Sequence, residues 1–225
     1  MRLLEKLERI GRAQALESTK RHLGRALLTR RLGVQLDPEH LIKTIDADRF
    51  EEIRRRYSID DPGAAWPKYL NLSKWMTTNL RRVRELELDF GFRKRILDLG
   101  CGAGYFLHIC QWLGHDVVGL DIDEVPMYGE MTHMFGLNRV IWRVKPFVRL
   151  PQFERKFDVV TAFMICFNGH KSPGLWGVSE WRFFLDDLET HLNPGGRICL
   201  GFNREDMAIS SARTCVGFLP NEARR

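Results

Sequence analysis

The sequence has few cysteines and no long apolar run. The longest apolar stretch, around residues 159–167, is well short of the roughly 20 residues that span a bilayer. Residues 1–35 alternate charge with leucine and contain neither the apolar stretch nor the cleavage site of a secretion signal. The five cysteines are widely spaced and form no CxxC pair. They are Cys101, Cys110, Cys166, Cys199 and Cys215. These absences argue against a membrane-spanning protein, a disulfide-stapled scaffold and a CxxC zinc site, and they favour the reducing cytoplasm.

Size and charge indicate one electrically balanced domain with a basic extension. A chain of 225 residues, 44% of them hydrophobic, can bury roughly 70% of its unfolded surface without help from a metal or a disulfide. The formal net charge is +6, and residues 1–35 account for all of it, with nine basic and three acidic side chains. The charge therefore gives no reason to expect that the main domain binds nucleic acid.

The basic segment has the pattern of an amphipathic helix. Its apolar side chains recur at nearly helical spacing: Leu3, Leu7, Ile10, Leu16, Leu23 and Leu27. We expect this helix to be broken near Gly24. Two interpretations stay open. The leucines either pack on the main domain or on a second copy of the chain, or the helix attaches to an anionic membrane, where each basic side chain contributes about 1 kcal/mol.

Further helices and a linker complete the extension. Asp37 and Pro38 are typical of a helix start, and Asp48 is a candidate cap for a helix over residues 49–57. Residues 61–67, which are rich in proline, glycine and alanine, then interrupt regular structure. We therefore expect a helical extension over residues 1–67 and a main domain over residues 68–225.

From residue 71 onward, helical patterns alternate with short apolar runs. The predicted helices cover residues 72–88, 105–113, 127–135 and 179–192. The predicted strands cover residues 95–99, 116–121, 139–144, 157–167 and 196–202. Near-continuous apolar strands separated by helices indicate a doubly wound, mostly parallel α/β sheet of the Rossmann-like kind, with helices on both faces. Such a sheet binds its ligand at the carboxyl ends of its strands.

A glycine-rich turn, Asp98-Leu99-Gly100-Cys101-Gly102-Ala103-Gly104, follows the first predicted strand. Three glycines at alternate positions let the backbone turn sharply and leave no Cβ to hold a ligand away. Asp121 ends the second predicted strand, where a carboxylate can accept hydrogen bonds from both hydroxyls of an adenosine ribose. Together these features predict a cofactor that contains a ribose.

The spacing of the glycines distinguishes two classes of cofactor. The dinucleotide fingerprint GxGxxG requires a glycine where Tyr105 stands, and Asp98 puts an acidic group at the turn, which suits a cation better than a pyrophosphate. The acidic-xGxGxG pattern resembles that of the class I S-adenosylmethionine-dependent methyltransferases. The resemblance covers residues 69–203 and extends in the same order to three further motifs: Val118–Asp121, Phe157–Val160 and Asn193–Gly196.

The resemblance implies a role for individual residues. The glycine turn would line the methionine part of the cofactor, with Asp98 near its ammonium group. Asp121 would accept the ribose hydroxyls, and Ile122 would lie against the adenine ring. The residues expected to bind the cofactor are Asp98, Gly100, Cys101, Gly102, Gly104, Asp121, Ile122, Val144, Lys145 and Phe163.

The sequence departs from the family pattern at two places. Many members have an acidic residue after the third strand to meet the adenine amino group, whereas residues 143–146 read Arg-Val-Lys-Pro, so backbone groups of Val144 or Lys145 are expected there instead. Only 22 residues follow Asn203, and residues 214–219 can supply one short strand. We therefore expect an abbreviated sheet, or an edge covered by the N-terminal helices or by another chain.

The methyl acceptor is expected to lie at residues 166–177, after the fourth strand. Methyl transfer from a sulfonium is an in-line displacement, so the protein must mainly align donor and acceptor. A hydroxyl acceptor also needs a base, and His170, with an unperturbed pKa of about 6.5, is the candidate catalytic base. Asn168 is the candidate for orienting the acceptor. The alternatives are a histidine that only bonds its own turn and an asparagine that only caps it.

Other side chains near the expected site have two interpretations each. Lys68 and Tyr69 either close over the cofactor carboxylate or form a solvated face. Cys101, between the glycines, is a small buried filler rather than a nucleophile. Four aromatic residues either wall an apolar substrate pocket or belong to the core: Phe163, Phe167, Trp176 and Trp181.

The sequence thus predicts a cytoplasmic S-adenosylmethionine-dependent methyltransferase. Its expected acceptor is a small molecule or glycan, methylated at oxygen. A nucleic-acid acceptor is disfavoured because the segment at 167–170 lacks the Pro-Pro-aromatic run of enzymes that methylate base amines. The alternatives are a nucleic-acid methyltransferase, an NAD-dependent oxidoreductase and a silent cofactor-binding subunit. A membrane-surface contact of the basic helix and a homo-oligomer are further expectations.

Overall fold

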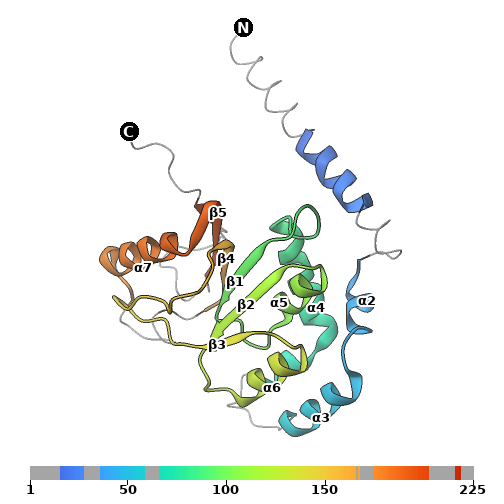
Figure 1. The fold of residues 1–225 in the computed structure, drawn as a ribbon. Helices are drawn as coiled ribbons and strands as arrows, with labels where there is room; N and C mark the ends of the chain where they lie inside the picture. Colours follow the sequence, from blue (N-terminus) through green and yellow to red (C-terminus); the bar gives the residue numbers. More distant parts are fainter. Residues whose placement is uncertain are drawn as a thin grey trace.

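A computed structural model describes residues 16–27, 36–58, 66–165, 167, 175–202 and 216–218. Within them, one six-stranded sheet has the order β3-β2-β1-β4-β5-β6 (Figure 1). The strands are β1 (Arg95–Leu99), β2 (Asp116–Asp121), β3 (Arg139–Ile141), β4 (Phe157–Phe163), β5 (Leu192–Gly201) and β6 (Val216–Phe218). The first five are parallel, and β6 runs antiparallel to β5. The strand order reverses between β1 and β4, where sheets of this kind bind their ligands.

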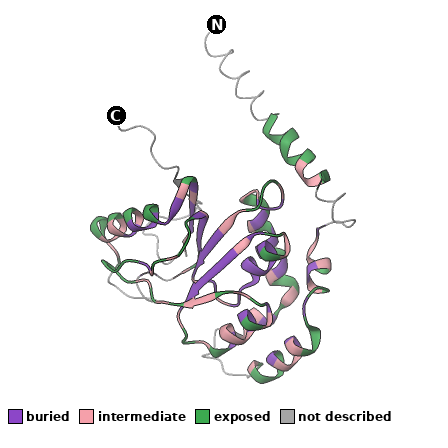
Figure 2. Ribbon diagram, viewed as in Figure 1, coloured by how far each residue is buried: buried purple, intermediate pink, exposed green. Residues whose placement is uncertain are grey.

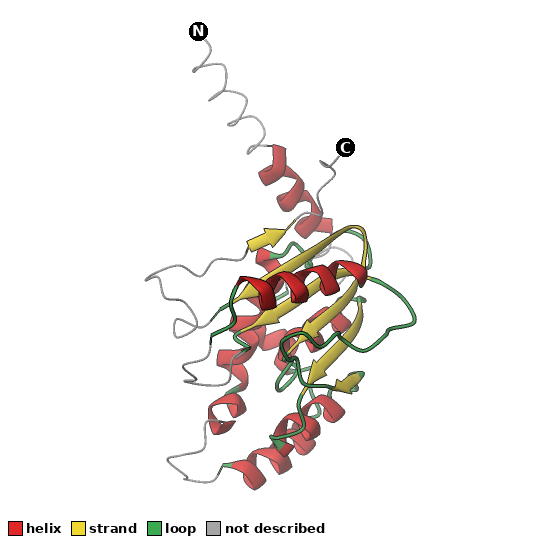
Figure 3. Ribbon diagram, turned by 90° about the vertical axis from the view of Figure 1, so that its left-hand side faces the viewer, coloured by secondary structure: helices red, strands yellow, loops and turns green. Residues whose placement is uncertain are grey.

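Helices cover both faces of the sheet. The helices are α2 (Pro38–Ile42), α3 (Ala47–Tyr57), α4 (Leu72–Glu85), α5 (Tyr105–Trp112), α6 (Pro126–Met134) and α7 (Val178–Thr190), with a 3₁₀ turn η1 (Trp66–Leu70). Buried residues of α2 to α6 form one apolar core. Those of α7 form a second core with the opposite face of the sheet, and Figure 3 shows the sheet between these two layers. The predicted Rossmann-like α/β fold is confirmed.

Alternation along the strands decides which side chains face α4. Ile96 belongs to the core on the α4 side, whereas Leu97 and Leu99 belong to the core on the α7 side. Because successive side chains of a strand point to opposite faces, Asp98 lies on the α4 side with Ile96. The same parity places Asp121 on this side with Val117. Both carboxyl groups of the predicted site therefore share one face of the sheet.

Three predicted strand boundaries are wrong by three residues or more. The fourth strand ends at Phe163 rather than at residue 167, because Met164 has a left-handed φ of 63° that extended backbone does not tolerate. The third strand ends at Ile141 rather than at residue 144, since only three of its residues pair with β2. The fifth strand starts at Leu192 rather than at residue 196, because Leu192 already pairs with Phe157.

The short strand expected within residues 214–219 is present as β6. It pairs with Ile198, Cys199 and Leu200 of β5 through an antiparallel register. Because β5 is thereby paired on both sides, its open edge is covered by one strand of the same chain. No further strand extends the sheet at this edge among the residues that the structure describes.

Helices α2 and α3 are built into the domain rather than appended to it. Leu41 and Ile53 are fully buried in the core that α4 and α5 share. Arg56 and Tyr57 of α3 bond to Glu130 of α6 at 2.7 Å. Asp37 caps α2, as predicted. The predicted cap of α3, Asp48, is wrong. The residue that caps this helix is Asp46, whose side chain accepts the N–H of Arg49 at 2.9 Å. Residues 59–65, where a linker is predicted, lie outside the described part of the chain.

The described helix of the basic segment, residues 16–27, turns its polar side toward the domain. Arg21 pairs with Glu87 at 2.5 Å and Arg25 with Asp89 at 2.6 Å. The helix continues through Gly24, contrary to prediction, and a Cβ there would lie only 2.7 Å from the Phe90 ring, so glycine permits close packing. Three leucines lie on the helix side opposite Arg21 and Arg25 and are 65%, 60% and 56% exposed: Leu16, Leu23 and Leu27. Figure 2 shows the described part of this helix as largely exposed.

This orientation contradicts one half of the first interpretation, in which the leucines pack on the main domain or on a second copy of the chain. The prediction that its leucines pack on the main domain is wrong for Leu16, Leu23 and Leu27, while residues 1–15 lie outside the described part of the chain. None of the described helices combines the length and the apolar character that crossing a membrane demands.

Candidate active site

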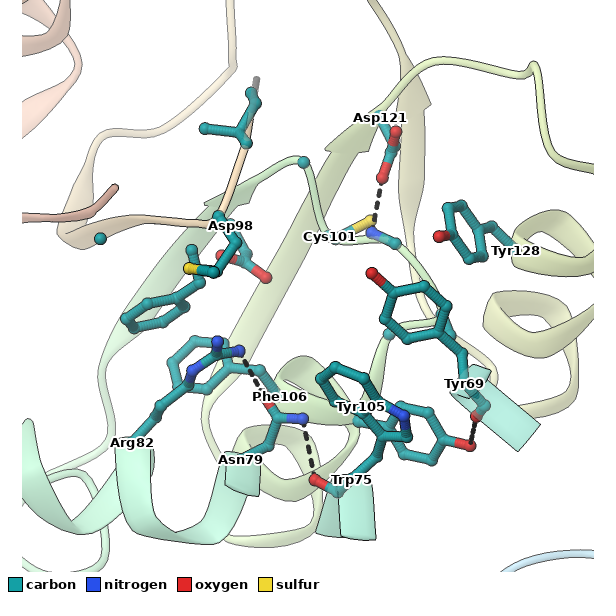
Figure 4. A pocket seen from close by; sticks show the side chains of 18 of the residues that line it. Tyr69, Trp75, Asn79, Arg82, Asp98, Cys101, Tyr105, Phe106, Asp121 and Tyr128 are labelled. Atoms are coloured by element: carbon teal, nitrogen blue, oxygen red, sulfur yellow. Dashed lines mark hydrogen bonds between the residues drawn. The ribbon is translucent and has the colours of Figure 1, made fainter. Parts of the chain in front are cut away.

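A cavity of about 1110 Å³ opens at the carboxyl ends of β1, β2 and β4. Residues of η1 and α4 form its lower wall in the view of Figure 4. Pockets that hold one small ligand usually measure about 300–1,000 Å³. The cavity is therefore large enough for two molecules side by side.

The glycine turn between β1 and α5 forms one side of the cavity. Gly102 has a φ of 52°, and a Cβ built there would find only the Tyr128 ring, at 4.0 Å, so the position opens into the cavity. Gly104 has a φ of 81° and precedes the first residue of α5, but a Cβ there would lie 2.6 Å from Leu137 Cδ1. Glycine is thus needed at 102 for an open wall and at 104 for packing against the chain after α6.

Asp121 is held by the backbone on both of its oxygens. Oδ2 accepts the N–H of Gly102 at 2.5 Å (Figure 4). Oδ1 accepts the N–H of Ile122 at 2.7 Å. Burial raises the pKa of this carboxyl, while the two backbone N–H groups act in the opposite direction. Each oxygen has a second lone pair, so the carboxylate can still accept bonds from a diol in the cavity.

Asp98 is more deeply buried and has fewer partners. Its Oδ1 accepts a hydrogen bond from the hydroxyl of Thr161, itself fully buried, at 2.6 Å. Burial raises the pKa of Asp98 to about 7, although the Thr161 hydroxyl and the positive charge of Arg82 both lower it. The carboxyl is therefore close to half ionised at neutral pH.

A polar chain runs along the α4 wall. Asn79, although buried, donates from Nδ2 to the carbonyl oxygen of Trp75 at 2.9 Å. Its Oδ1 accepts a bond from Nη1 of Arg82 at 2.9 Å. The Arg82 guanidinium then lies 4.5 Å over the ring of Phe163, at the end of β4. Figure 4 shows Arg82 beside Asn79 along the α4 wall. The chain of bonds holds this cation at the cavity rather than in solvent.

Aromatic side chains form the opposite end of the same wall. The ring of Tyr69 lies 4.5 Å from that of Trp75 and 5.5 Å from that of Tyr128. Tyr105 donates from its hydroxyl to the Tyr69 carbonyl at 2.6 Å. Burial raises the pKa of both Tyr105 and Tyr128 above the ordinary value, so both phenols are neutral at physiological pH. Lys68 Nζ lies 5.1 Å over the Tyr69 ring.

Most residues expected to bind the cofactor line this cavity: Asp98, Gly100, Cys101, Gly102, Gly104, Asp121, Ile122, Val144 and Phe163. Lys68, Tyr69 and Phe167 line it as well. Lys145 is exposed and is not among the lining residues. The two residues expected to act on the acceptor, Asn168 and His170, lie outside the described part of the chain.

The structure distinguishes the interpretations of the remaining candidates. Trp176 and Trp181 do not line the cavity and pack with Phe167 and Phe184, at ring distances of 4.9 to 6.0 Å, so the core interpretation holds for these tryptophans. Burial raises the pKa of the Cys101 thiol well above its ordinary value. A protonated, buried thiol is a poor nucleophile, as expected of a filler.

Sequence reasoning missed the contribution of α4, notably Trp75, Asn79 and Arg82. One signal was available. Asn79 lies in the apolar stripe that Met76, Leu80 and Val83 bury, and a polar residue at such a position needs a bonding partner.

The strand order, the glycine turn and the carboxylate that ends β2 define an α/β protein that binds a nucleoside-containing ligand. A family model described as a methyltransferase domain matches residues 69–214, well over half of the chain. The chain therefore belongs to this methyltransferase family. The predicted membership of the class I S-adenosylmethionine-dependent superfamily is confirmed, and S-adenosylmethionine is the cofactor of this class.

Two curated relatives are ubiquinone biosynthesis O-methyltransferases. The protein of Sinorhizobium medicae (strain WSM419) is 28% identical over 132 residues, which cover 56% of this chain and 50% of that protein. The mitochondrial protein of Schizosaccharomyces pombe (strain 972 / ATCC 24843) is 27% identical over 168 residues, with coverage of 72% and 56%. The chain thus spans about half the length of the curated relatives it matches.

Solved structures are also similar. CalS10, an amino pentose methyltransferase from Micromonospora echinaspora, is 25% identical with a TM-score of 0.44, covering 57% of this chain and 50% of that one. DesVI of Streptomyces venezuelae is 21% identical with a TM-score of 0.47, covering 68% and 62%.

Asp98 should titrate near pH 7 in the folded protein, against about 3.9 in an unfolded chain. An acid whose pKa is raised by folding stabilises the folded state at low pH, and this contribution is lost as the pH rises from about 4 to about 7. Asp98→Asn should remove this loss, which amounts to about 4 kcal/mol at most. Urea unfolding from pH 4 to pH 8 measures this loss of stability, with ¹³C NMR of the Asp98 carboxyl as the direct reading of its pKa.

Thr161→Val should raise the pKa of Asp98 further, because the carboxylate loses a hydrogen-bond donor. An Asp98 carboxyl that titrates near 4 in the wild-type protein would contradict the prediction.

Proposed function

We propose that this protein is a cytosolic enzyme that transfers a methyl group from S-adenosylmethionine to an oxygen of a small molecule or glycan. The observation that carries the proposal is the pairing of Asp121 with the glycine turn at a cavity large enough for two molecules. Family membership gives the type of reaction. The buried thiols of Cys101 and Cys110 suit a reducing compartment.

The lining residues fit the cofactor. Gly102 leaves space where a side chain would stand, and Asp121 offers two oxygens with free lone pairs to the ribose hydroxyls. Asp98 supplies a carboxyl for the ammonium group, and Ile122 and Val144 supply apolar surface for the adenine. When bound, the cofactor supplies an activated methyl group. The protein's own task is to hold the two reactants in line and to exclude water, and such positioning is worth about 7–11 kcal/mol.

Replacing Asp121 tests the cofactor site. Asp121→Ala should weaken binding of S-adenosylhomocysteine by about 1–3 kcal/mol, because the ribose hydroxyls lose their acceptors. Isothermal titration calorimetry measures this change. Asp116→Ala, at the opposite end of the same strand, is the matched control and should leave the affinity unchanged.

Two results of this titration would oppose the assignment. Equal affinity of the Asp121→Ala and wild-type proteins would count against the ribose placement. Binding of NAD without binding of S-adenosylhomocysteine would favour an oxidoreductase instead.

His170 remains the proposed general base, with Asn168 orienting the acceptor. The support is the position of both residues in the sequence directly after β4, whose carboxyl end opens into the cavity. His170→Ala should slow methyl transfer by about a hundredfold or more while the affinity for S-adenosylhomocysteine stays the same. Transfer of tritiated methyl groups into a metabolite extract measures the rate. His133→Ala, on exposed surface of α6, serves as control, and an unchanged rate in His170→Ala would retire the role.

We also propose that helix 16–27 contacts a membrane surface. Arg21 and Arg25 pair with the domain, so the stripe of leucines on the opposite side of the helix faces outward: Leu16, Leu23 and Leu27. The helix belongs to a basic segment, residues 1–35, whose net positive charge suits anionic lipid. The alternative occupant of this stripe is a second copy of the chain.

Vesicle flotation separates these occupants. The wild-type protein should float with vesicles of phosphatidylglycerol and phosphatidylcholine, and a variant with all three leucines changed to glutamine should not. Light scattering on the same proteins is the second measurement. A dimer that the triple variant loses, together with no flotation, would assign the stripe to a second copy.

A further inference from the structure

A second cavity lies at the opposite end of the sheet from the candidate active site. Its volume is about 610 Å³, and its lining comes from residues at or next to the first residues of β1, β2, β4 and β5. Five of the eight lining residues are basic, and two are acidic, so the cavity has a formal excess of three positive charges. We call it the basic cleft, after its cations Arg93, Lys94, Arg95, Arg155 and Lys156.

The two acidic side chains of the basic cleft already have partners in its wall. Oδ2 of Asp116 accepts hydrogen bonds from Nη1 of Arg95 at 3.0 Å and from Nη2 of Arg155 at 2.5 Å, so two guanidinium groups share one carboxylate. Asp158 accepts the backbone N–H of Arg95 at 2.7 Å and the side-chain amide of Asn193 at 2.9 Å. Both carboxylates are therefore engaged within the wall.

The other three cations lack a carboxylate partner in the described part of the chain. Among those residues, no acidic side chain lies within ion-pair distance of Arg93, Lys94 or Lys156. Burial lowers the pKa of the neighbouring His115, and the positive charges of Lys94 and Arg93 lower it further. Cations gathered at one cleft repel one another, and a bound anion relieves this repulsion.

The backbone that carries the two lysines is held by the sheet. The backbone N–H of Lys94 donates to Nδ1 of His115 at 3.0 Å, and the Lys94 carbonyl oxygen accepts the N–H of Asp116 at 2.9 Å. Lys156 directly precedes Phe157, the first residue of β4. Because the sheet fixes where both side chains begin, less conformational entropy is lost when they gather around a ligand.

Arg95 is built into the wall of the cleft. Its side chain is only 16% exposed, and its guanidinium lies 5.0 Å over the ring of Phe157. Nη1 bonds to Asp116, whereas Nη2 donates to no protein group in the part of the chain that the structure describes. A guanidinium presents its donors in a planar fork that matches a phosphate, and a phosphate has enough oxygens to bond lysines at the same time.

We propose that the basic cleft binds a ligand that carries a phosphate monoester or a diphosphate, held by Arg95, Lys94 and Lys156. Such a group belongs either to a soluble metabolite or to the headgroup of a membrane lipid. The site is separate from the cavity proposed for methyl transfer, so a protein without bound S-adenosylmethionine binds this ligand as well.

Calorimetry with inorganic pyrophosphate tests the site. The wild-type protein should bind pyrophosphate at least tenfold more tightly than acetate, and the double variant Lys94→Gln/Lys156→Gln should lose at least tenfold in affinity for pyrophosphate. The matched control Lys43→Gln/Arg55→Gln removes two exposed positive charges outside the cleft and should stay within twofold of the wild type. Equal affinities for pyrophosphate and acetate, or equal losses in the two double variants, would overturn the proposal.

A measurement on the wild-type protein covers the case in which Lys94→Gln/Lys156→Gln does not fold. N-hydroxysuccinimidyl acetate acetylates lysines, and mass spectrometry of peptides reports the rate at each one. Pyrophosphate should slow the acetylation of Lys94 and Lys156 and leave that of Lys43 unchanged. Protection of Lys68 and Lys74 alone, which line the candidate active site, would overturn the proposal, and so would equal rates with and without pyrophosphate.

Vesicles distinguish the two sources of the phosphate group. Arg21 of helix 16–27 pairs with Glu87, in the segment that leads into β1, so a lipid source is compatible with the proposed membrane contact. Flotation is measured with vesicles of phosphatidic acid and phosphatidylcholine, on the variant whose three outward leucines are changed to glutamine. Flotation that Lys94→Gln/Lys156→Gln abolishes assigns the cleft to a lipid headgroup. Pyrophosphate binding without flotation assigns it to a soluble ligand, and the absence of both would overturn the proposal.

Discussion

The hydrogen bond from the Gly102 N–H to Asp121 joins the two strands on which the site depends. Parallel pairing of β1 with β2 brings the turn after Leu99 beside the end of β2, and the N–H groups of Gly100 and Cys101 both donate to the Leu120 carbonyl. The carboxylate then fixes the middle of the turn at 2.5 Å. Gly119 makes this approach possible, because a Cβ there would lie 2.7 Å from Cys101 Sγ.

The two carboxyl groups of the site, Asp98 and Asp121, differ in the hydrogen-bond donors that oppose the effect of burial on their pKa values. Asp98 and Asp121 share one face of the sheet and are both buried. Asp121 accepts hydrogen bonds from two backbone N–H groups, whereas Asp98 accepts one from the hydroxyl of Thr161. Donors stabilise the ionised form of a carboxyl, and burial opposes it. Burial therefore raises the pKa of both carboxyl groups, and two backbone N–H groups oppose this rise at Asp121 where one hydroxyl opposes it at Asp98.

The sequence was informative where one local signal determines the structure. Apolar runs predicted β1 and β2, because parallel strands that are buried on both faces consist of near-continuous apolar residues. The spacing of the glycines predicted the turn between β1 and α5. Strand ends were harder to predict. Met164 ends β4 with a left-handed φ of 63°, which a methionine in an apolar run does not indicate.

The way in which helices pack on the sheet and on one another could not be predicted. The cavity wall of Asn79 and Arg82 depends on the angle at which α4 crosses the sheet, and no local pattern encodes such an angle. The direction of helix 16–27 has the same origin. Its leucines predicted an apolar contact with the domain, but acidic residues after α4, Glu87 and Asp89, attract its arginines instead.

The burial of α2 and α3 changes where this protein can be divided. The matched family region begins at residue 69, yet Leu41, Phe50 and Ile53 lie in the same core as Met76 and Leu80 of α4. A fragment cut at the family boundary would leave the back of α4 open to water, while the front of the same helix forms the cavity wall. The shape of the cavity is thus maintained by helices α2 and α3, which the matched family region leaves out.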